Sequence, residues 1–169
     1  MRLLSILFLI FLFLFSACGP DPATQDLLEQ TQVKNVLTQL FVETDNRNWQ
    51  KVAECFAGEV LFDMTSMAGG EPTTMTPQNI VDVWDEGLKS LQAIHHQVGN
   101  FKIQIDGNGA EAFCYGIESH YLPNETGEDT RTFVGSYNFH LSKMDNIWRI
   151  DFFKFNHKYT AGNMNLEGA

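Results

Sequence analysis

The segment DGNGAEAFCYGIESHY, Asp106 to Tyr121, sets the fold of the second half of the chain. Its first four residues have the composition of a hairpin turn, and the residues that follow indicate a long strand. The residues MDN at 144–146 repeat the turn signal further along. Together the two turns predict a meander of four long strands, at 92–106, 109–122, 131–144 and 147–160.

The chain before this meander is mainly helical. Residues 25–44 carry apolar side chains at helical spacing along one stripe. The elements predicted here are a helix at 25–44, a short second helix from Trp49 to about Gly58, a strand at 60–65, a loop at 67–75 and a third helix at 76–90. Helices followed by strands favour an α+β fold, in which an antiparallel sheet is covered on one face.

The N-terminus has the features of a targeting signal. Arg2 precedes an apolar run from Leu3 to Phe15, and small residues lead to Cys18. This run is shorter than the ~20 residues that a spanning helix needs. Because FSAC at 15–18 resembles a bacterial lipobox, we expect a lipoprotein signal peptide at 1–17, a lipid on Cys18 and a lipidated tether at 18–24. An ordinary secretory signal and an uncleaved anchor are the alternatives.

Composition limits the partners of the protein. The 169 residues carry a formal net charge of -10, so the chain lacks the clustered cations that bind nucleic acid. It also lacks a basic patch for an anionic membrane, and we expect membrane contact through the N-terminal lipid only, at the bacterial cell envelope. Cys55 and Cys114 match no zinc pattern, and we interpret them as small buried hydrophobes, with one disulfide as the alternative.

Several segments together resemble a known family. They are ETDNRNWQKVAECFAGEVLFDMTSMAGG at 43–70, HHQVGN at 95–100, the hairpin segment above, and NIWRIDFFKFNHKYTAGN at 146–163. Their order is similar to that of the SnoaL-like group of the nuclear transport factor 2-like superfamily, which includes polyketide cyclases and is related to scytalone dehydratase. The resemblance implies a strongly curved antiparallel sheet wrapped around three helices as a cone with a pocket, in a domain at 25–165 followed by a tail at 166–169.

The resemblance also implies a set of acid–base residues. Dehydratase relatives line their pocket with an Asp after the first helix, a His shortly before a glycine pair or Gly-Asn, and a His on the next strand. Asp45, His96 and His120 match those positions. Two tyrosines that position a water in those relatives correspond here to Thr44 and Met64. We expect the substrate to contact Trp84, Asn100, Met64 and Tyr137.

The two adjacent histidines have opposite strand parity. His95 shares the parity of Phe101, Ile103 and Ile105, so strict alternation would group it with the apolar face unless a bulge intervenes. We expect one histidine in the pocket and the other packed or at an interface. Parity does not choose between them, whereas the family resemblance selects His96.

These residue types suit proton transfer. An imidazole titrates near neutrality, and Asp45 can fix the tautomer of His96 while His120 acts as the partner acid or as a donor to a developing enolate oxygen. Such a set can move a proton next to a carbonyl, the step common to dehydration, isomerisation and aldol cyclisation. We expect no cofactor and no metal, although two histidines and a carboxylate could also form a metal site.

Three functions remain open from the sequence. The first is a cofactor-independent lyase, isomerase or cyclase acting on a small apolar carbonyl substrate. The second is a non-catalytic module that binds a small hydrophobic ligand, and the third is a scaffold that forms a homodimer through the open sheet face. Structural roles also remain open, since His96 could be a hydrogen-bonded core residue and Asp45 could cap the second helix.

Overall fold

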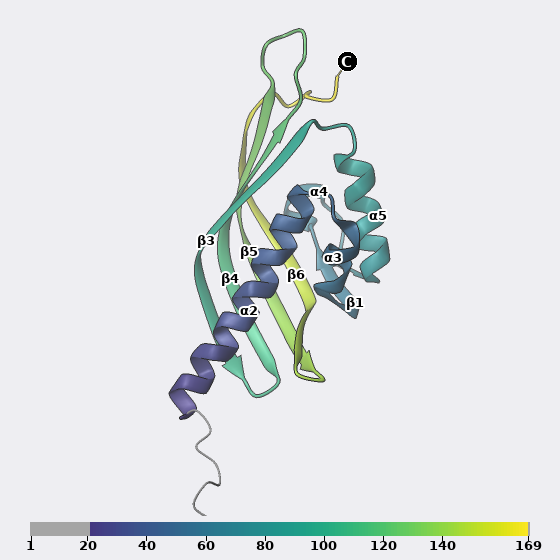
Figure 1. The fold of residues 1–169 in the computed structure, drawn as a ribbon. Coiled ribbons are helices and arrows are strands. Elements are labelled where there is room, and N and C mark those ends of the chain that lie inside the picture. Colours follow the sequence, from purple (N-terminus) through teal and green to yellow (C-terminus); the bar gives the residue numbers. More distant parts are fainter. Residues whose placement is uncertain (1–20, 169) are drawn as a thin grey trace, which may run out of the picture.

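A computed structural model describes residues 21–168 of the chain (Figure 1). One six-stranded sheet, in the order β2-β1-β6-β5-β4-β3, is combined with four helices in the described part of the chain. The elements are α2 (Pro22–Asp45), α3 (Trp49–Glu54), β1 (Phe56–Asp63), α4 (Thr65–Ala68), β2 (Thr73–Met75), α5 (Pro77–Leu88), β3 (Ala93–Asp106), β4 (Gly109–Tyr121), β5 (Thr130–Met144) and β6 (Ile147–Gly162). The predicted α+β fold is confirmed.

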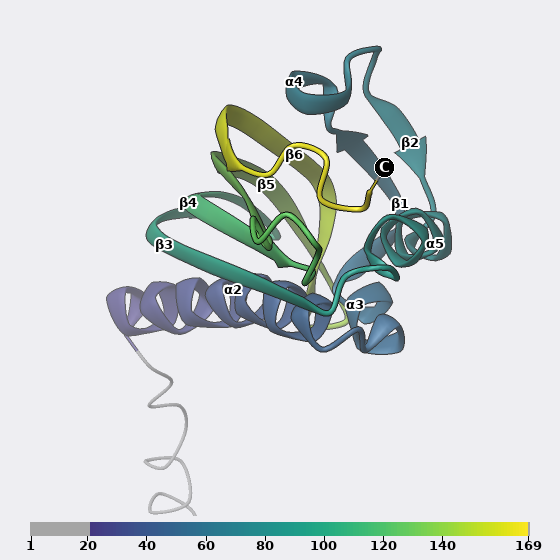
Figure 2. The same ribbon diagram turned by 90° about the horizontal axis from the view of Figure 1, so that it is seen from above.

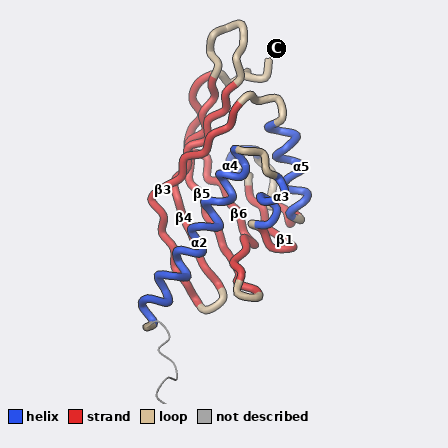
Figure 3. The backbone as a smooth tube through the Cα atoms, viewed as in Figure 1, coloured by secondary structure: helices blue, strands red, loops and turns tan. Residues whose placement is uncertain are grey.

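The sheet is strongly curved and open, and the helices lie against its concave side (Figures 2 and 3). Helix α2 crosses this side and packs mainly on β3, whereas α5 lies beside α3 and β1. The buried stripe of α2, Val33, Leu37, Leu40 and Phe41, belongs to the main core. That core also holds Phe139 and Ile150 from the long strands, and apolar burial of this kind is the main stabilising term of the fold.

The four long strands match the predicted meander to within two residues at each end. The two predicted turns join β3 to β4 and β5 to β6, and all three pairings within the meander are antiparallel. We expected an antiparallel sheet throughout. The pairing of β1 with β6 is parallel, however, so this part of the expectation was wrong. Strand periodicity carries no information on the direction of a partner, which depends on how the chain returns through α4, β2 and α5.

The predicted boundaries near residue 56 were wrong. The second helix ends at Glu54, and Phe56 already belongs to β1, where it pairs with Ile150 of β6. The Ile150 amide donates to the Cys55 carbonyl, which draws the chain into the sheet directly after the helix. The expected loop at 67–75 instead contains the end of α4 and the short strand β2. In each case a long-range pairing overrides the local pattern.

Both ends of the domain differ from the expected tether and tail. Helix α2 begins at Pro22, because the Asp21 side chain accepts hydrogen bonds from the backbone amides of Ala23 and Thr24. At the other end Leu166 is buried in a second apolar cluster with Leu88, Leu91 and Ile94. Residues 22–24 are therefore helical, and 166–168 are not a free tail.

Two expectations concern residues outside this description. The signal peptide at 1–17 and the lipid site at Cys18 lie outside residues 21–168. Among the described residues, no helix is both long enough and apolar enough to cross a membrane. Cys55 and Cys114 are buried and unpaired with each other, as expected for small hydrophobes, and burial raises the pKa of each thiol to about 12.

Candidate active site

A cavity of about 250 Å³ lies between the concave side of the sheet and the helices. Most of its wall is apolar, with six aromatic side chains from α2, α5, β5 and β6 among them and Met64 and Met67 near α4. The polar side of the wall is formed by residues of β3, β4 and the start of β5. Its lining residues are Phe41, Thr44, Met64, Met67, Val83, Trp84, Gly87, Leu88, His96, Glu118, His120, Arg131, Phe133, Tyr137, Phe153 and Phe155.

A bulge in β3 determines which histidine reaches the cavity. The pairing of β3 with β4 is irregular between Gly99 and Lys102, and Asn100 there has a φ of 56°. Residues 94, 96 and 98 face inward before the bulge, whereas residues 101, 103 and 105 do so after it. The extra residue at the bulge thus changes which alternate residues of β3 face inward, from even-numbered before it to odd-numbered after it. His96 consequently has only 8% of its side chain exposed, while His95 has 74%.

Asn100 does not contact the cavity, and this part of the expected substrate contacts was wrong. Its side chain is exposed and is not part of the cavity wall. The physical reason is the bulge itself, in which Asn100 takes up the left-handed conformation that asparagine tolerates better than most residues. Its role is therefore conformational, since it lets the strand change phase.

Asp45 holds His96 from the end of α2. Its carboxylate lies 2.6 Å from the His96 Nδ1 atom, and its two oxygens also accept from the His96 backbone amide at 3.1 and 2.9 Å. The predicted contact between the two residues is present. Asp45 does not cap the second helix, whose N-cap is Asn48. It fixes both the backbone and the ring of His96, and so orients the other ring nitrogen, Nε2, away from the helix.

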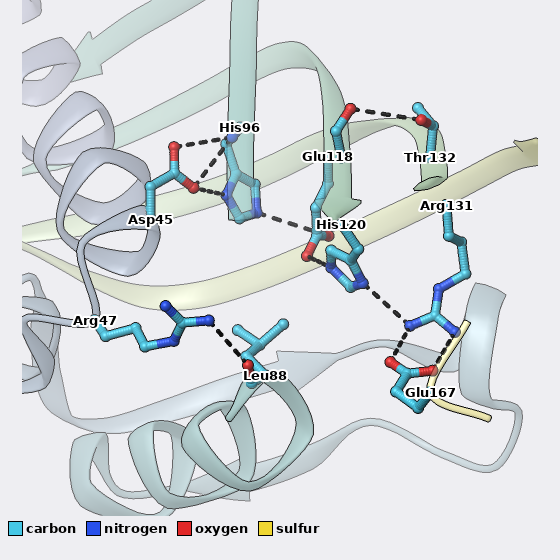
Figure 4. Close-up of polar contacts among 10 residues, drawn as sticks. Asp45, Arg47, Leu88, His96, Glu118, His120, Arg131, Thr132 and Glu167 are labelled. Atoms are coloured by element: carbon cyan, nitrogen blue, oxygen red, sulfur yellow. Dashed lines mark hydrogen bonds and ion pairs between the residues drawn. The ribbon is translucent and has the colours of Figure 1, made fainter. Parts of the chain in front are cut away.

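A row of polar side chains continues from His96 along the wall (Figure 4). Glu118 follows, with one oxygen 3.6 Å from His96 Nε2 and the other 2.6 Å from His120 Nε2. The second ring nitrogen of His120 lies 3.1 Å from the Arg131 guanidinium, which in turn forms two hydrogen bonds with the Glu167 carboxylate. Helix α2, the three strands β3, β4 and β5, and the C-terminal segment thus contribute to one connected row.

The hydrogen bonds define the tautomer of His120. Arginine has donors only, so His120 Nδ1 must accept from Arg131 and carries no proton. The ring proton therefore lies on Nε2 and is donated to Glu118. His120 lines the cavity as predicted. Its N–H is directed at the Glu118 carboxylate, however, so it fixes the position of Glu118.

Charge shifts the pKa values of the two central groups in opposite directions. Burial alone would lower the His96 pKa, but hydrogen bonding and charge from Asp45 and Glu118 together outweigh it and raise the pKa to about 9. Burial would raise the Glu118 pKa, but hydrogen bonds and charge from His120 and His96 hold it far below its usual range. At neutral pH, His96 is an imidazolium beside an ionised Glu118.

The remaining predicted residues line the cavity from three sides. Trp84 contributes from α5, and Met64 from the turn before α4. Tyr137 is buried between Phe41 and Phe155, and burial together with the charge of Glu118 raises its pKa well above the usual range. The Tyr137 hydroxyl has no hydrogen bond to any residue within 21–168, so it remains available to a ligand.

Glu118 is the functional candidate that the sequence analysis missed. It stands two residues before His120 on β4, and side chains two apart on a strand share a face. This parity was visible in the sequence, but the family resemblance drew attention to Asp45, His96 and His120 alone. Arg131 and Glu167 could not be found in this way, because they meet His120 only through strand pairing and the fold of the C-terminal segment.

Comparisons with known proteins agree with this architecture. Residues 25–154 match the family model of the SnoaL-like domain. Among solved structures, the chain is similar to the Kfla4162 protein from Kribbella flavida, with 19% identity, a TM-score of 0.78, and 86% of this chain and 98% of that chain covered. No curated protein sequence gives a significant match.

Two further solved structures carry names that refer to chemistry. One is the hexachlorocyclohexane dehydrochlorinase LinA-type3 from Novosphingobium barchaimii LL02, with 11% identity, a TM-score of 0.68, and 82% and 92% of the two chains covered. The other is a protein from Streptomyces avermitilis, provisionally named a dehydratase of the nuclear transport factor 2-like family, with 10% identity, a TM-score of 0.66, and 80% and 99% covered. At these identities the likeness establishes the fold alone.

Proposed function

The chain belongs to the SnoaL-like domain family, and we propose that it is a cofactor-independent acid–base enzyme acting on a small apolar substrate with a carbonyl group. The observation that carries this proposal is His96, held by Asp45 and facing Glu118 on the polar wall of an otherwise apolar cavity. Ionisable groups are costly to bury unless they are paired, so their concentration at this one wall favours chemistry over packing.

The proposed chemistry is proton transfer next to the carbonyl. One group of the wall accepts a proton from the carbon adjacent to the carbonyl, and the C–H electron pair moves to form an enolate. A donor of the wall stabilises the charge on the oxygen, and the low polarity of the cavity strengthens that interaction. In a dehydration, the electron pair then forms a carbon–carbon double bond while the β-hydroxyl leaves as water with a proton from the donor.

The cavity is consistent with a substrate of one or two rings. Its volume of about 250 Å³ is small, and Phe41, Trp84, Tyr137 and Phe153 offer ring faces and edges. The names of the dehydrochlorinase and the dehydratase above both describe eliminations, which supports a lyase over the isomerase and cyclase alternatives.

We further propose that a signal peptide at 1–17 and a lipid on Cys18 place this domain at the bacterial cell envelope.

A second candidate function is a binding module for a small hydrophobic ligand. The observation that favours it is the largely apolar cavity wall. The family resemblance adds that Thr44 and Met64 correspond to the water-positioning tyrosines of dehydratase relatives. A third candidate function is a scaffold that forms a homodimer through the sheet face, because the outer face of β4 and β6 exposes Tyr115, Ile117 and Tyr159.

Two probe reactions separate these functions. We expect the purified domain to accelerate exchange of the α-protons of 2-indanone in D₂O, followed by NMR, and dehydration of 4-hydroxy-4-phenylbutan-2-one, followed by ultraviolet absorbance. His96→Gln should abolish both, whereas His95→Gln, its exposed neighbour, should behave as the wild type. A retained small molecule in native mass spectrometry without any turnover of either probe would instead establish the binding module.

A further inference from the structure

We propose that Glu118 is the proton acceptor of this site and that His96 is its proton donor. This assignment rests on the proposed acid–base function and deepens it. It reverses the expectation from the sequence, in which the histidine paired with Asp45 takes the proton. Four features of the described structure lead to it.

The first feature is that carboxylates face both ring nitrogens of His96. Asp45 lies 2.6 Å from Nδ1, and Glu118 lies 3.6 Å from Nε2. A neutral imidazole would direct the lone pair of one nitrogen at a carboxylate, which is repulsive. Only the imidazolium presents an N–H to each carboxylate. His96 then has no lone pair with which to accept a proton from a substrate.

The second feature is that Glu118 keeps one oxygen free. His120 Nε2 donates to Oε1 at 2.6 Å, but the 3.6 Å between Oε2 and His96 Nε2 is longer than an ordinary hydrogen bond. Oε2 therefore retains lone pairs for a substrate proton. Glu118 is also the one carboxylate among the described residues that line the cavity, since Asp45 lies behind His96.

The third feature is that Glu118 is held in place by its neighbours. Arg131 donates to His120 Nδ1 and so forces the proton of His120 onto Nε2, where it secures Glu118 Oε1. Glu167 in turn holds Arg131 with hydrogen bonds of 2.6 and 2.9 Å. His120, Arg131 and Glu167 are positioning residues in this arrangement, because they act on the substrate only through Glu118.

The fourth feature is that one short transfer restores the site. Proton abstraction leaves Glu118 neutral, and donation of the Nε2 proton to the leaving hydroxyl leaves His96 neutral while water departs. The two atoms that must then exchange one proton, Oε2 and Nε2, are 3.6 Å apart, so a small approach of the two side chains brings them to hydrogen-bonding distance. An isomerisation would return the proton from Glu118 to the substrate at another carbon.

The groups that face this pair come from every adjoining element. Asp45 approaches from α2, His120 from β4, Arg131 and Tyr137 from β5, and Glu167 from the C-terminal segment.

The wild-type rate should be flat across neutral pH and fall as the pH rises through about 9, where His96 loses its second ring proton. A neutral histidine base would show the opposite dependence, with a rate that rises through the neutral range.

The test combines ¹⁵N NMR of the wild-type histidines with exchange of 2-indanone by two variants. We expect both His96 nitrogens to be protonated at pH 7.5 and to titrate near 9. Glu118→Gln should lower exchange by about a hundredfold or more, the usual scale for loss of a general base. Its matched control is Glu111→Gln, an exposed carboxylate on the same strand.

The outcomes separate this inference from the function on which it rests. An unprotonated His96 ring nitrogen at pH 7.5, or an exchange rate of Glu118→Gln within threefold of the wild type, would overturn the assignment. Neither result would contradict the proposed acid–base function. Absence of exchange by the wild type itself would overturn the proposed function, and the assignment with it. The NMR measurement needs no variant, so it is unaffected if Glu118→Gln fails to fold.

Discussion

Two carboxylates, Glu29 near the start of α2 and Glu118 of β4 near the other end of that helix, behave in different ways. Glu29 accepts from Lys143 at 2.7 Å, from the Trp148 indole at 2.8 Å and from Gln25 at 2.7 Å, so both of its oxygens are occupied. Glu118 has a partner at normal distance on one oxygen only, and the other borders a cavity.

The contrast shows how a structural carboxylate differs from a functional one. A buried charge is tolerated when its hydrogen-bonding capacity is filled, and the cluster around Glu29 meets that condition without leaving room for a ligand. Glu118, in contrast, has one carboxylate oxygen without a hydrogen bond at normal distance, and this oxygen borders a cavity that a small molecule can enter. Burial alone therefore does not identify a site, whereas burial with unused capacity beside a cavity does.

The largest expected effect tests the cavity end of this comparison. Asp45→Asn removes the charge that orients and protonates His96, so we expect exchange of 2-indanone to fall by about a thousandfold or more, as happens when the carboxylate partner of a catalytic histidine is lost. NMR-monitored exchange measures it. Asp151→Asn is the matched control, because it breaks a similar pair with His140 away from the cavity. Equal losses in the two variants would contradict the special role of Asp45.

The next effect concerns stability. Glu29→Gln leaves the Lys143 ammonium without its partner in a buried setting, and we expect the free energy of unfolding to fall by about 3 kcal/mol. Glu118→Gln should lower it by less, because His96 keeps Asp45 as a charged partner and the amide oxygen of residue 118 can still accept from His120. Urea denaturation of both variants measures the difference. The comparison fails if Glu118→Gln is the more destabilising change.

The contributions of His96 and Glu29 to stability should also respond to pH in opposite directions. The His96 pKa is raised from 6.5 to about 9, so its stabilising contribution is fully present below about pH 6.5 and is lost as the pH rises through about 9, at up to about 3 kcal/mol. Hydrogen bonds from Lys143 and Trp148 lower the Glu29 pKa, so its contribution is present above its ordinary pKa and is lost in acid.

Denaturation curves at several pH values measure these contributions. His96→Gln should remove the loss of stability between pH 6.5 and 9, and Glu29→Gln should leave that loss unchanged. A wild-type protein whose stability is constant over this range would show that His96 is not held as an imidazolium.

The smallest effect is expected beside the site. His95 is largely exposed, and its ring lies 3.7 Å from the Asp45 carboxylate. Exposed pairs of this kind contribute little, so His95→Gln should change the free energy of unfolding by no more than about 0.5 kcal/mol and leave exchange of 2-indanone unaltered. Thermal melts and the exchange assay measure both. A large loss of activity would mean that His95 shares the role given to its neighbour.

Local signals in the sequence determined much of the fold and part of the site. The turns at 106–109 and 144–146 fix the meander because their backbone requirements are met by the residues at those positions alone. The helices at 25–44 and 76–90 follow from periodicity, which is also local. Asp45, His96 and His120 were found through a family pattern along the chain; the structure places His96 and His120 on the cavity wall and Asp45 behind His96.

Only the tertiary structure decided the remaining features. The bulge at Asn100 turns His96 inward, β1 joins β6 in parallel, and Arg131 and Glu167 reach His120 from distant parts of the chain. Each depends on which residues face one another across strands, and no short segment contains that information. Protonation of His96 and the free oxygen of Glu118 are of the same kind, because they arise from distances between residues of different elements and not from the residue types themselves.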